Sequence, residues 1–286
     1  MQLGIHLTRY DAGPADIAPL LAALGRAVDE AGIDVLSLPD HFLQVPYVGP
    51  VHEPVLEGYT ALAFLAAHTE RVELQLLDGS ATMRHPAWLA KTVATLDVLS
   101  GGRARLAIGP GWYEQEHRAL GVPFPPLRDR FEQLEEALQV VRLMWSGEDR
   151  PFSGDHYRLA STLCSPLPFR QVPLMVMGVG ERKALRIVAK YADACHLFAG
   201  GDSDAAFVAG KLAALREHCE AEGRDPSEIS NTILWTDEVS HPGTFLERMR
   251  EMADVGVDEV HVRLSEHPVE LARALGEHVV PALHEL

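Results

Sequence analysis

Short runs of apolar residues alternate along the chain with longer segments in which apolar residues recur at helical spacing. The short runs predict strands at residues 3–8, 35–39, 72–77, 103–108, 174–177, 194–198, 232–236 and 259–264. The longer segments predict helices at residues 15–31, 57–68, 86–99, 128–145, 182–191, 204–222, 244–255 and 269–286. Strands that alternate with helices in this way are typical of a parallel sheet whose strands are joined by helical crossovers.

Local signals support several of these boundaries. Gly32 follows the first predicted helix and Pro86 opens the third, which are favoured places for these residues. The clearest amphipathic stripe lies at 128–145. The segment 146–172 is irregular and contains Pro, Ser and Gly, and we expect a hairpin or lid within it at 152–157.

The number of units selects the fold class. Eight strand-and-helix pairs of about 36 residues each match a (β/α)8 TIM barrel of ordinary size. A doubly wound sheet is the alternative, but it usually has fewer units, and no GxGxxG motif follows the first predicted strand. We therefore expect one α/β TIM-barrel domain over residues 1–286, with an insertion between the fourth and fifth strands.

The composition is that of an ordinary globular protein, with 47% hydrophobic and 23% charged residues. The net charge is −16, from 41 acidic and 25 basic side chains, which argues against nucleic acid or an anionic membrane as a partner. The three cysteines show no CxxC spacing, and we find neither a basic and apolar leader nor an uninterrupted run of about 18 apolar residues. These features predict a cytoplasmic protein that acts on a small-molecule substrate.

In such a barrel the active site lies at the carboxyl ends of the strands. His6, Asp40, His41 and His196 stand near the ends of predicted strands. Asp40 and His41 are the candidate catalytic pair, because a carboxylate beside a histidine can orient its ring for general-base chemistry near neutral pH. The alternative is that Asp40 caps a turn and that His41 is a polar residue of the rim.

A second candidate site follows the fourth predicted strand. Gly109 and Gly111 form a Gly-x-Gly turn, where bare backbone can approach a planar ligand closely. Glu114 is the candidate acid partner of His41, and Trp112 can form a wall of the pocket. The alternatives are that Glu114 begins the next helix, near its positive end, and that Trp112 belongs to the core.

A third candidate site follows the fifth predicted strand, where the sequence GVGERK occupies 178–183. Two glycines that precede a helix with cations in its first turn suit a phosphate group. The candidate ligands are Gly178, Val179, Gly180, Glu181 and Arg182. In so acidic a chain a positive pocket must be built locally, and we expect Lys183 and Arg84 to contribute to it.

Several motifs together resemble the luciferase-like monooxygenase superfamily, and within it the class of oxidoreductases that use coenzyme F420, a 5-deazaflavin. They are SLPDHF at 37–42, EGYTAL at 57–62, AHTER at 67–71, RHP at 84–86, AKTVATLDVLSGGR at 90–103, GPGW at 109–112, GVPFPPL at 121–127 and YADA at 191–194. Each motif is weak alone, but in this order they cover most of the chain.

The resemblance implies a TIM barrel, commonly a homodimer, that binds F420 or FMN at the carboxyl end of the strands. It implies that His41 moves a substrate proton while a hydride passes to or from the deazaflavin, and that Glu114 is its acid partner. The cofactor phosphate would lie on the loop 178–182. The ring would lie against Asp78 and Gly79 at the end of the third strand, and His6 and His196 would face the substrate.

The chain departs from the family pattern at three places around this pocket. Asp78 stands where small residues and threonines are common, Met177 where a glycine is common, and His196 where relatives tend to have an uncharged residue such as asparagine. FMN is the alternative cofactor.

Two further hypotheses lie outside flavin chemistry. In the first, His6, His41, Asp78 and His196 converge on a metal such as zinc, or carry out acid–base chemistry without a cofactor. In the second, the chain is a binding protein without catalytic activity.

Overall fold

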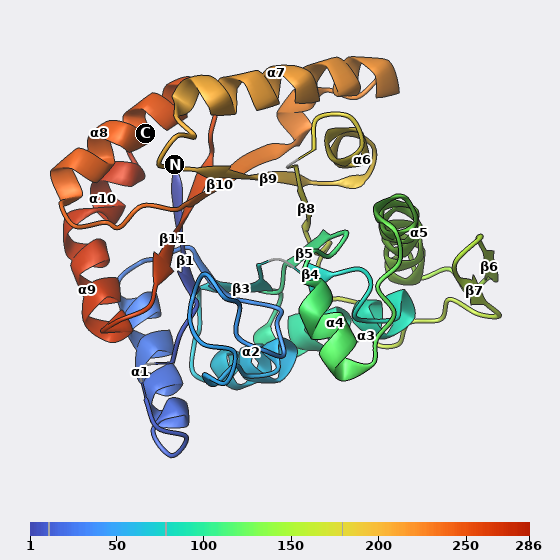
Figure 1. Ribbon diagram of the computed structural model, residues 1–286, viewed down its shortest axis with the longest axis horizontal. Helices are drawn as coiled ribbons and strands as arrows, with labels where there is room; N and C mark the ends of the chain where they lie inside the picture. The colour runs from blue at the N-terminus through green and yellow to red at the C-terminus, as the bar shows by residue number, and fades with distance from the viewer. Residues whose placement is uncertain (11, 78, 179) are drawn as a thin grey trace.

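The computed structural model describes residues 1–10, 12–77, 79–178 and 180–286. Its main sheet has nine parallel strands in the order β3-β2-β1-β11-β10-β9-β8-β5-β4, which surround a central axis (Figure 1). The strands are β1 (Gln2–Leu7), β2 (Val35–Leu38), β3 (Glu73–Leu76), β4 (Gly79–Ser80), β5 (Leu106–Gly109), β8 (Leu174–Met177), β9 (Ala194–Ala199), β10 (Ser230–Trp235) and β11 (Glu259–Leu264).

The sheet is a nearly closed barrel. Strand β1 pairs with both β2 and the last strand, β11. On the other side, Leu74 of β3 exchanges backbone hydrogen bonds with Arg103 and Arg105, just before β5. The (β/α)8 TIM barrel is therefore confirmed, and the doubly wound alternative is wrong because it leaves two free edges.

Helices cover the outside of the barrel (Figure 1). They are α1 (Ile17–Glu30), α2 (Gly58–Ala66), α3 (Pro86–Ser100), α4 (Glu114–Leu120), α5 (Leu127–Trp145), α6 (Ala184–Tyr191), α7 (Ala205–Glu222), the 3-10 helix η1 (Pro226–Glu228), α8 (Pro242–Asp254), α9 (Pro268–His278) and α10 (Val280–Leu283). Their buried apolar side chains join those of the strands in one large core cluster. No helix in the described ranges is long and apolar enough to cross a membrane.

Some elements differ from the sequence prediction. The two-residue strand β4 was not expected, because it is too short to show a period, and helix α4 begins at Glu114, in agreement with the alternative considered for that residue. The predicted helix at 269–286 is two helices, and Pro281, which has no backbone N–H to donate, lies at the start of the second. The hairpin expected at 152–157 is confirmed as the antiparallel pair β6 (Phe152–Ser153) and β7 (Arg158–Leu159).

An ionic cluster fills the barrel at the amino ends of the strands. The Arg105 guanidinium lies between the carboxylates of Glu73 and Glu259, at 2.7 Å from Glu259 Oε2. His261 Nε2 donates to Glu259 Oε1 at 2.6 Å. Gly4 leaves room for this ring, since a Cβ there would lie 2.4 Å from His261 Nδ1. Side chains of the described residues therefore fill the centre of the barrel at the amino ends of the strands.

Candidate active site

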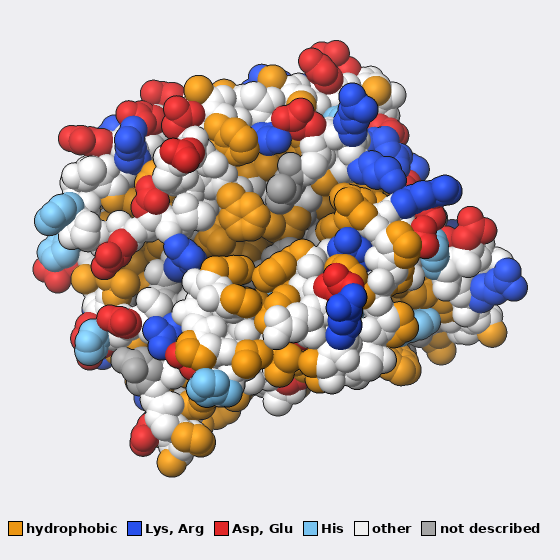
Figure 2. All heavy atoms as spheres, viewed as in Figure 1, with side chains coloured by type: hydrophobic (Ala, Val, Ile, Leu, Met, Phe, Trp, Pro, Cys, Tyr) orange, Lys and Arg blue, Asp and Glu red, His pale blue; other side chains and the backbone are white. Residues whose placement is uncertain are grey.

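A cavity of about 660 Å³ lies at the carboxyl ends of the strands. Figure 2 shows it as a hollow lined mainly by hydrophobic side chains in the middle of this face. The lining residues with polar or aromatic side chains include His6, Thr8, His41, Gln44, Tyr47, Trp112, Arg130, Phe131, His196, Phe198, Thr236 and Arg263. The volume falls in the range of roughly 300–1,000 Å³ that small-molecule sites occupy.

The charge of the lining is opposite to that of the whole chain. Two arginines, Arg130 and Arg263, face the cavity together with three histidines. Among the described lining residues there is no Asp or Glu, although the chain carries a net charge of −16. The cavity is therefore suited to an anionic ligand.

His41 lines the cavity from the loop after β2 and is held by Glu116. The ring donates from Nδ1 to Glu116 Oε2 at 3.3 Å, and Glu116 Oε1 accepts the backbone N–H groups of Phe42 and Leu43 at 2.7 and 2.9 Å. Burial alone would raise the pKa of Glu116, but these hydrogen bonds, led by that from His41, lower it. An ionised Glu116 fixes the proton of His41 on Nδ1 and leaves Nε2 with a free lone pair.

The sequence prediction named the wrong partner for His41. Glu114 is half exposed, forms an ion pair with Arg118 at 2.7 Å and does not line the cavity. Both glutamates lie in the first turn of α4, where each residue advances about 100° around the axis. Two positions along, Glu116 therefore points in nearly the opposite direction, toward His41.

Asp40 does not orient His41 either. Its carboxylate is buried and accepts from Arg84 Nη1 at 2.6 Å, while Arg84 Nη2 donates to Glu57 Oε1 at 2.6 Å. Because two carboxylates engage Arg84, this guanidinium is not available to a ligand. The expected role of Arg84 in a phosphate site is therefore wrong. Asp40 instead fixes, through its bond to Arg84, the loop that carries His41.

The turn after β5 brings an aromatic wall to the cavity. Trp112 stacks on Tyr113 with 5.0 Å between ring centroids and meets the His41 ring edge-on at 5.5 Å. Gly111 precedes it with φ of 77°, and a Cβ there would lie 2.3 Å from Ser80 Oγ. Gly109 ends β5 and pairs with β4, where the predicted ligand Gly79 is buried.

A hydrogen-bond chain fixes this turn from behind. His117 Nδ1 donates to the carbonyl oxygen of Tyr113 at 2.9 Å, so its Nε2 accepts from Thr82 Oγ1 at 2.7 Å. Thr82 in turn accepts from Ser80 Oγ at 2.7 Å. The backbone that carries Trp112 is therefore held by side chains of the β4 segment and of α4.

The predicted phosphate loop lies only partly on the cavity. Gly180 lines it, whereas Gly178 is packed against Cys195 and Leu185. The predicted ligands Glu181 and Arg182 are exposed and do not line the cavity, and Glu181 forms an ion pair with Lys211 at 2.8 Å. Val179, like Asp78, lies outside the described residues.

Two other cationic side chains, Lys183 and Arg130, supply positive charge near Gly180 and Gly111. Lys183 Nζ lies 5.8 Å from the ring centroid of Phe131, which lines the cavity. Arg130 donates to the carbonyl oxygen of Gly111 and stacks 4.1 Å from the Phe124 ring centroid. Sequence reasoning missed Arg130, because nothing in the pattern shows that the first turn of α5 faces the cavity.

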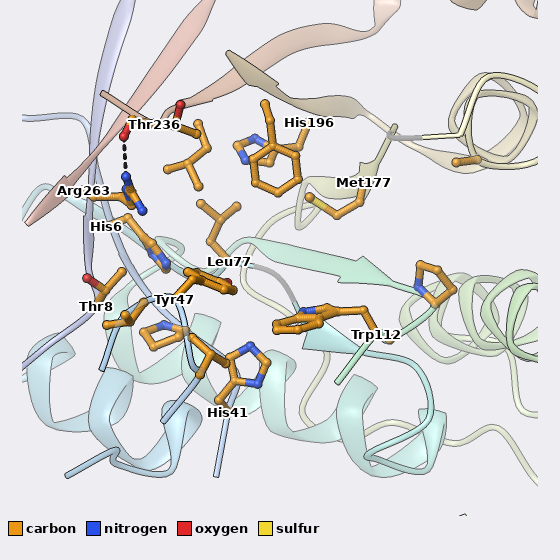
Figure 3. A pocket seen from close by; sticks show the side chains of 18 of the residues that line it. His6, Thr8, His41, Tyr47, Leu77, Trp112, Met177, His196, Thr236 and Arg263 are labelled. Carbon is orange, nitrogen blue, oxygen red and sulfur yellow. Dashed lines mark hydrogen bonds between the residues drawn. The ribbon is translucent and has the colours of Figure 1, made fainter. Parts of the chain in front are cut away.

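His6 and His196 both line the cavity, as the sequence predicted (Figure 3). His6 lies on β1, and its Nδ1 is 3.0 Å from Oγ of Ser37 on the neighbouring strand β2. His196 is fully buried, its Nδ1 lies 2.5 Å from Thr232 Oγ1, and its Nε2 has no partner among the described residues. Burial lowers the pKa of His6 to about 3 and lowers that of His196 well below its usual value, so both rings are neutral.

The metal hypothesis gains no support from the described residues. Among them, no group of three or more His, Cys, Asp or Glu side chains is arranged to hold a metal ion. Asp78, which that hypothesis required, lies outside them.

Comparisons with known proteins agree with this geometry. A family model described as luciferase-like monooxygenase matches residues 6–236. The chain is 33% identical over 276 residues to the F420-dependent glucose-6-phosphate dehydrogenase of Kineococcus radiotolerans, which covers 94% of this chain and 79% of that protein. It is 30% identical over 204 residues to the pyrimidine monooxygenase RutA of Enterobacter cloacae, which covers 70% of this chain and 55% of that protein.

Solved structures show the same fold. An F420-dependent secondary alcohol dehydrogenase in complex with an F420-acetone adduct superposes with a TM-score of 0.82, at 18% identity, over 99% of this chain and 98% of that one. A long-chain alkane monooxygenase, LadA, superposes with a TM-score of 0.83, at 15% identity, over 100% of this chain and 91% of that one.

Proposed function

Because this chain belongs to the luciferase-like monooxygenase family, we propose that it is an oxidoreductase that transfers a hydride between coenzyme F420 and a small organic substrate. The observation that carries the proposal is the His41–Glu116 pair, whose free Nε2 faces a cavity with cationic and apolar lining. The relative from Kineococcus, with 33% identity, is an F420-dependent dehydrogenase, which supports the choice of cofactor.

The residues around the cavity fit a deazaflavin. Trp112 and Met177 offer apolar surface to a planar ring, and the backbone of Gly111 and Gly180 allows close approach. Arg130 on the cavity wall and Lys183 beside Phe131 suit the anionic tail of the cofactor. When bound, F420 supplies two-electron hydride transfer at a carbon of the substrate.

His41 provides the proton transfer that accompanies this step. In the oxidative direction its Nε2 accepts the proton of a substrate hydroxyl, and in the reductive direction Nε2–H returns a proton to the carbonyl oxygen. The Glu116 carboxylate stabilises the imidazolium that forms and keeps the ring in one orientation. Trp112, which meets the His41 ring edge-on, limits its movement.

A titration with F420 tests this assignment of the cavity. Trp112→Ala should weaken F420 binding by roughly 10-fold, since stacked aromatic surface is worth about 1–3 kcal/mol. Trp88→Ala is the matched control, because Trp88 is 74% exposed and does not line the cavity. Cofactor fluorescence gives both affinities, and equal affinities for the two variants would show that F420 binds elsewhere.

We also expect one domain and a homodimer. Exposed apolar side chains gather at the end of α3, where Leu99 is 67% exposed and Phe169 is 75% exposed beside Gly102. Such a patch favours a partner surface. Light scattering of the purified protein at micromolar concentration should give a mass of twice 31.3 kDa, and a mass of 31.3 kDa would contradict the dimer.

A further inference from the structure

Arg263 faces the cavity from the strand next to that of His6. Strands β1 and β11 pair with His6 and Arg263 in register, so both side chains point to the same side of the sheet. Figure 3 shows Arg263 beside Thr236 and His6, across the cavity from Trp112. The guanidinium donates to the carbonyl oxygen of Thr236, and within the described ranges no carboxylate forms an ion pair with it.

This lack of a carboxylate distinguishes Arg263 from Arg84 and Arg105. Arg84 and Arg105 are each held by two carboxylates. Arg263 is exposed to the cavity and keeps donors free for a ligand. A planar guanidinium in this state is suited to bind a carboxylate or a phosphate through two parallel hydrogen bonds.

His6 presents a hydrogen-bond acceptor next to Arg263. Ser37 Oγ donates to the carbonyl oxygen of Ile5 at 3.0 Å, so it must accept from His6 Nδ1. The proton of the neutral His6 ring is therefore on Nδ1, and its Nε2 is an acceptor. A hydroxyl group of a ligand can donate to it.

His196 supplies the second observation that points to a ligand. Its side chain is fully buried and lines the cavity, but its Nε2 has no hydrogen-bond partner in the described part of the chain. Buried polar atoms are rarely left unpaired, and those that are often mark a place where a ligand completes the bonding. His196 and His6 are close enough to influence each other electrostatically.

We propose that Arg263, His6 and His196 form the substrate-recognition subsite, and that the substrate is a small hydroxylated anion. The carboxylate or phosphate of the substrate binds the Arg263 guanidinium, and its hydroxyl groups bind His6 Nε2 and His196 Nε2. The two neutral rings add selectivity for hydroxyl groups without attracting a second negative charge. This inference deepens the proposed function, on which it rests for the identity of the reaction.

The test is calorimetric titration of the full chain without cofactor. Three probes are used: gluconate, which is a hydroxylated carboxylate; glycerol 3-phosphate, which is a hydroxylated phosphate; and uncharged glycerol. We expect at least one of the two anions to bind at least 10-fold more tightly than glycerol, and the preferred anion tells carboxylate from phosphate. Equal or undetectable binding of all three probes would overturn the proposal.

Variants of Arg263 test whether the anions bind to this residue. Arg263→Gln should weaken anion binding at least 10-fold, and Arg263→Lys, which keeps the charge but not the planar fork, should give an intermediate affinity. Arg182→Gln is the matched control, because Arg182 is exposed and does not line the cavity. Unchanged anion affinity in folded Arg263→Gln or Arg263→Lys, checked by circular dichroism, would refute the subsite.

Different results would contradict the proposed cofactor and the proposed substrate subsite. F420 binding is measured on the same preparation, without the anions. Anion binding that depends on Arg263 in a protein that does not bind F420 would support the subsite and contradict the proposed cofactor. F420 binding in a protein that binds neither anion would contradict the subsite alone.

Discussion

The chemistry of the site depends on which carboxylate touches His41. Glu116 accepts the ring N–H and two backbone N–H groups, which lower its pKa and keep it ionised at neutral pH. Glu114, two residues earlier on the same helix, points to solvent and Arg118. The pair therefore offers a matched comparison of two glutamates that differ in position and not in chemistry.

We predict that Glu116→Gln lowers kcat by roughly 10- to 100-fold, because the neutral amide stabilises the His41 imidazolium less well and no longer fixes its tautomer. Glu114→Gln should leave kcat within about twofold of the wild type. Steady-state kinetics with F420 measures both variants, and a larger loss in Glu114→Gln would contradict the assignment.

Individual site residues were predictable where strand position alone decides orientation. The sequence places His6, His41 and His196 near the ends of predicted strands, and the structure places all three on the cavity, although His196 lies within β9 and not at its end. Glu116 was not predictable, since the start of α4, and with it the direction of each side chain, depends on tertiary contacts. The partners of Asp40 could not be foreseen for the same reason.

At the scale of elements, the turn between β5 and α4 positions the aromatic wall. Gly111 adopts a φ of 77° and lies against Ser80 and Thr82. The hydroxyl groups of these two residues belong to the series of hydrogen bonds that ends at His117. Gly121, after the same helix, has a φ of 69° but nothing within 4 Å of its missing Cβ. The two glycines share a positive φ and differ in packing.

Gly111→Ala should therefore be more destabilising than Gly121→Ala. The strain of a positive φ costs about 1 kcal/mol in each, and overpacking against Ser80 adds about 1–3 kcal/mol at Gly111 alone. Urea unfolding, followed by far-ultraviolet circular dichroism, gives both values. Equal losses of stability in the two variants would show that Ser80 and Thr82 can move aside for a Cβ at position 111 without a cost in free energy.

The elements themselves were largely predictable. All eight expected strands exist, because buried parallel strands are continuous apolar runs bounded by turns. Strand β4 was missed, and helix α4 was foreseen only as an alternative for Glu114, because a span of two residues, or of one to two turns, carries no measurable period. These two elements build the turn that carries Trp112, so local sequence was least informative near the site.

At the scale of the whole molecule, neutral histidines inside the barrel make stability depend on pH. Burial, with the nearby His261, His41 and Arg263, lowers the pKa of His6 from 6.5 to about 3. Between these values the unfolded chain binds a proton at this residue and the folded chain does not. The free energy of unfolding therefore falls as the pH drops below 6.5, by about 1.4 kcal/mol per unit.

His6→Asn should remove this contribution. Between pH 7 and pH 5 the wild type should lose about 2 kcal/mol more stability than the variant. His278→Asn is the control, since His278 is exposed and should leave the wild-type slope unchanged. Urea midpoints at both pH values give the comparison, and parallel losses in wild type and His6→Asn would contradict a neutral His6.

The most direct measurement is the affinity of the purified chain for F420 and for FMN, titrated side by side by cofactor fluorescence. The cationic, carboxylate-poor cavity and the F420-dependent relative predict saturable F420 binding at micromolar concentration, at least 10-fold tighter than FMN binding. Tighter binding of FMN, or no binding of F420 at high micromolar concentration, would contradict an F420-dependent oxidoreductase.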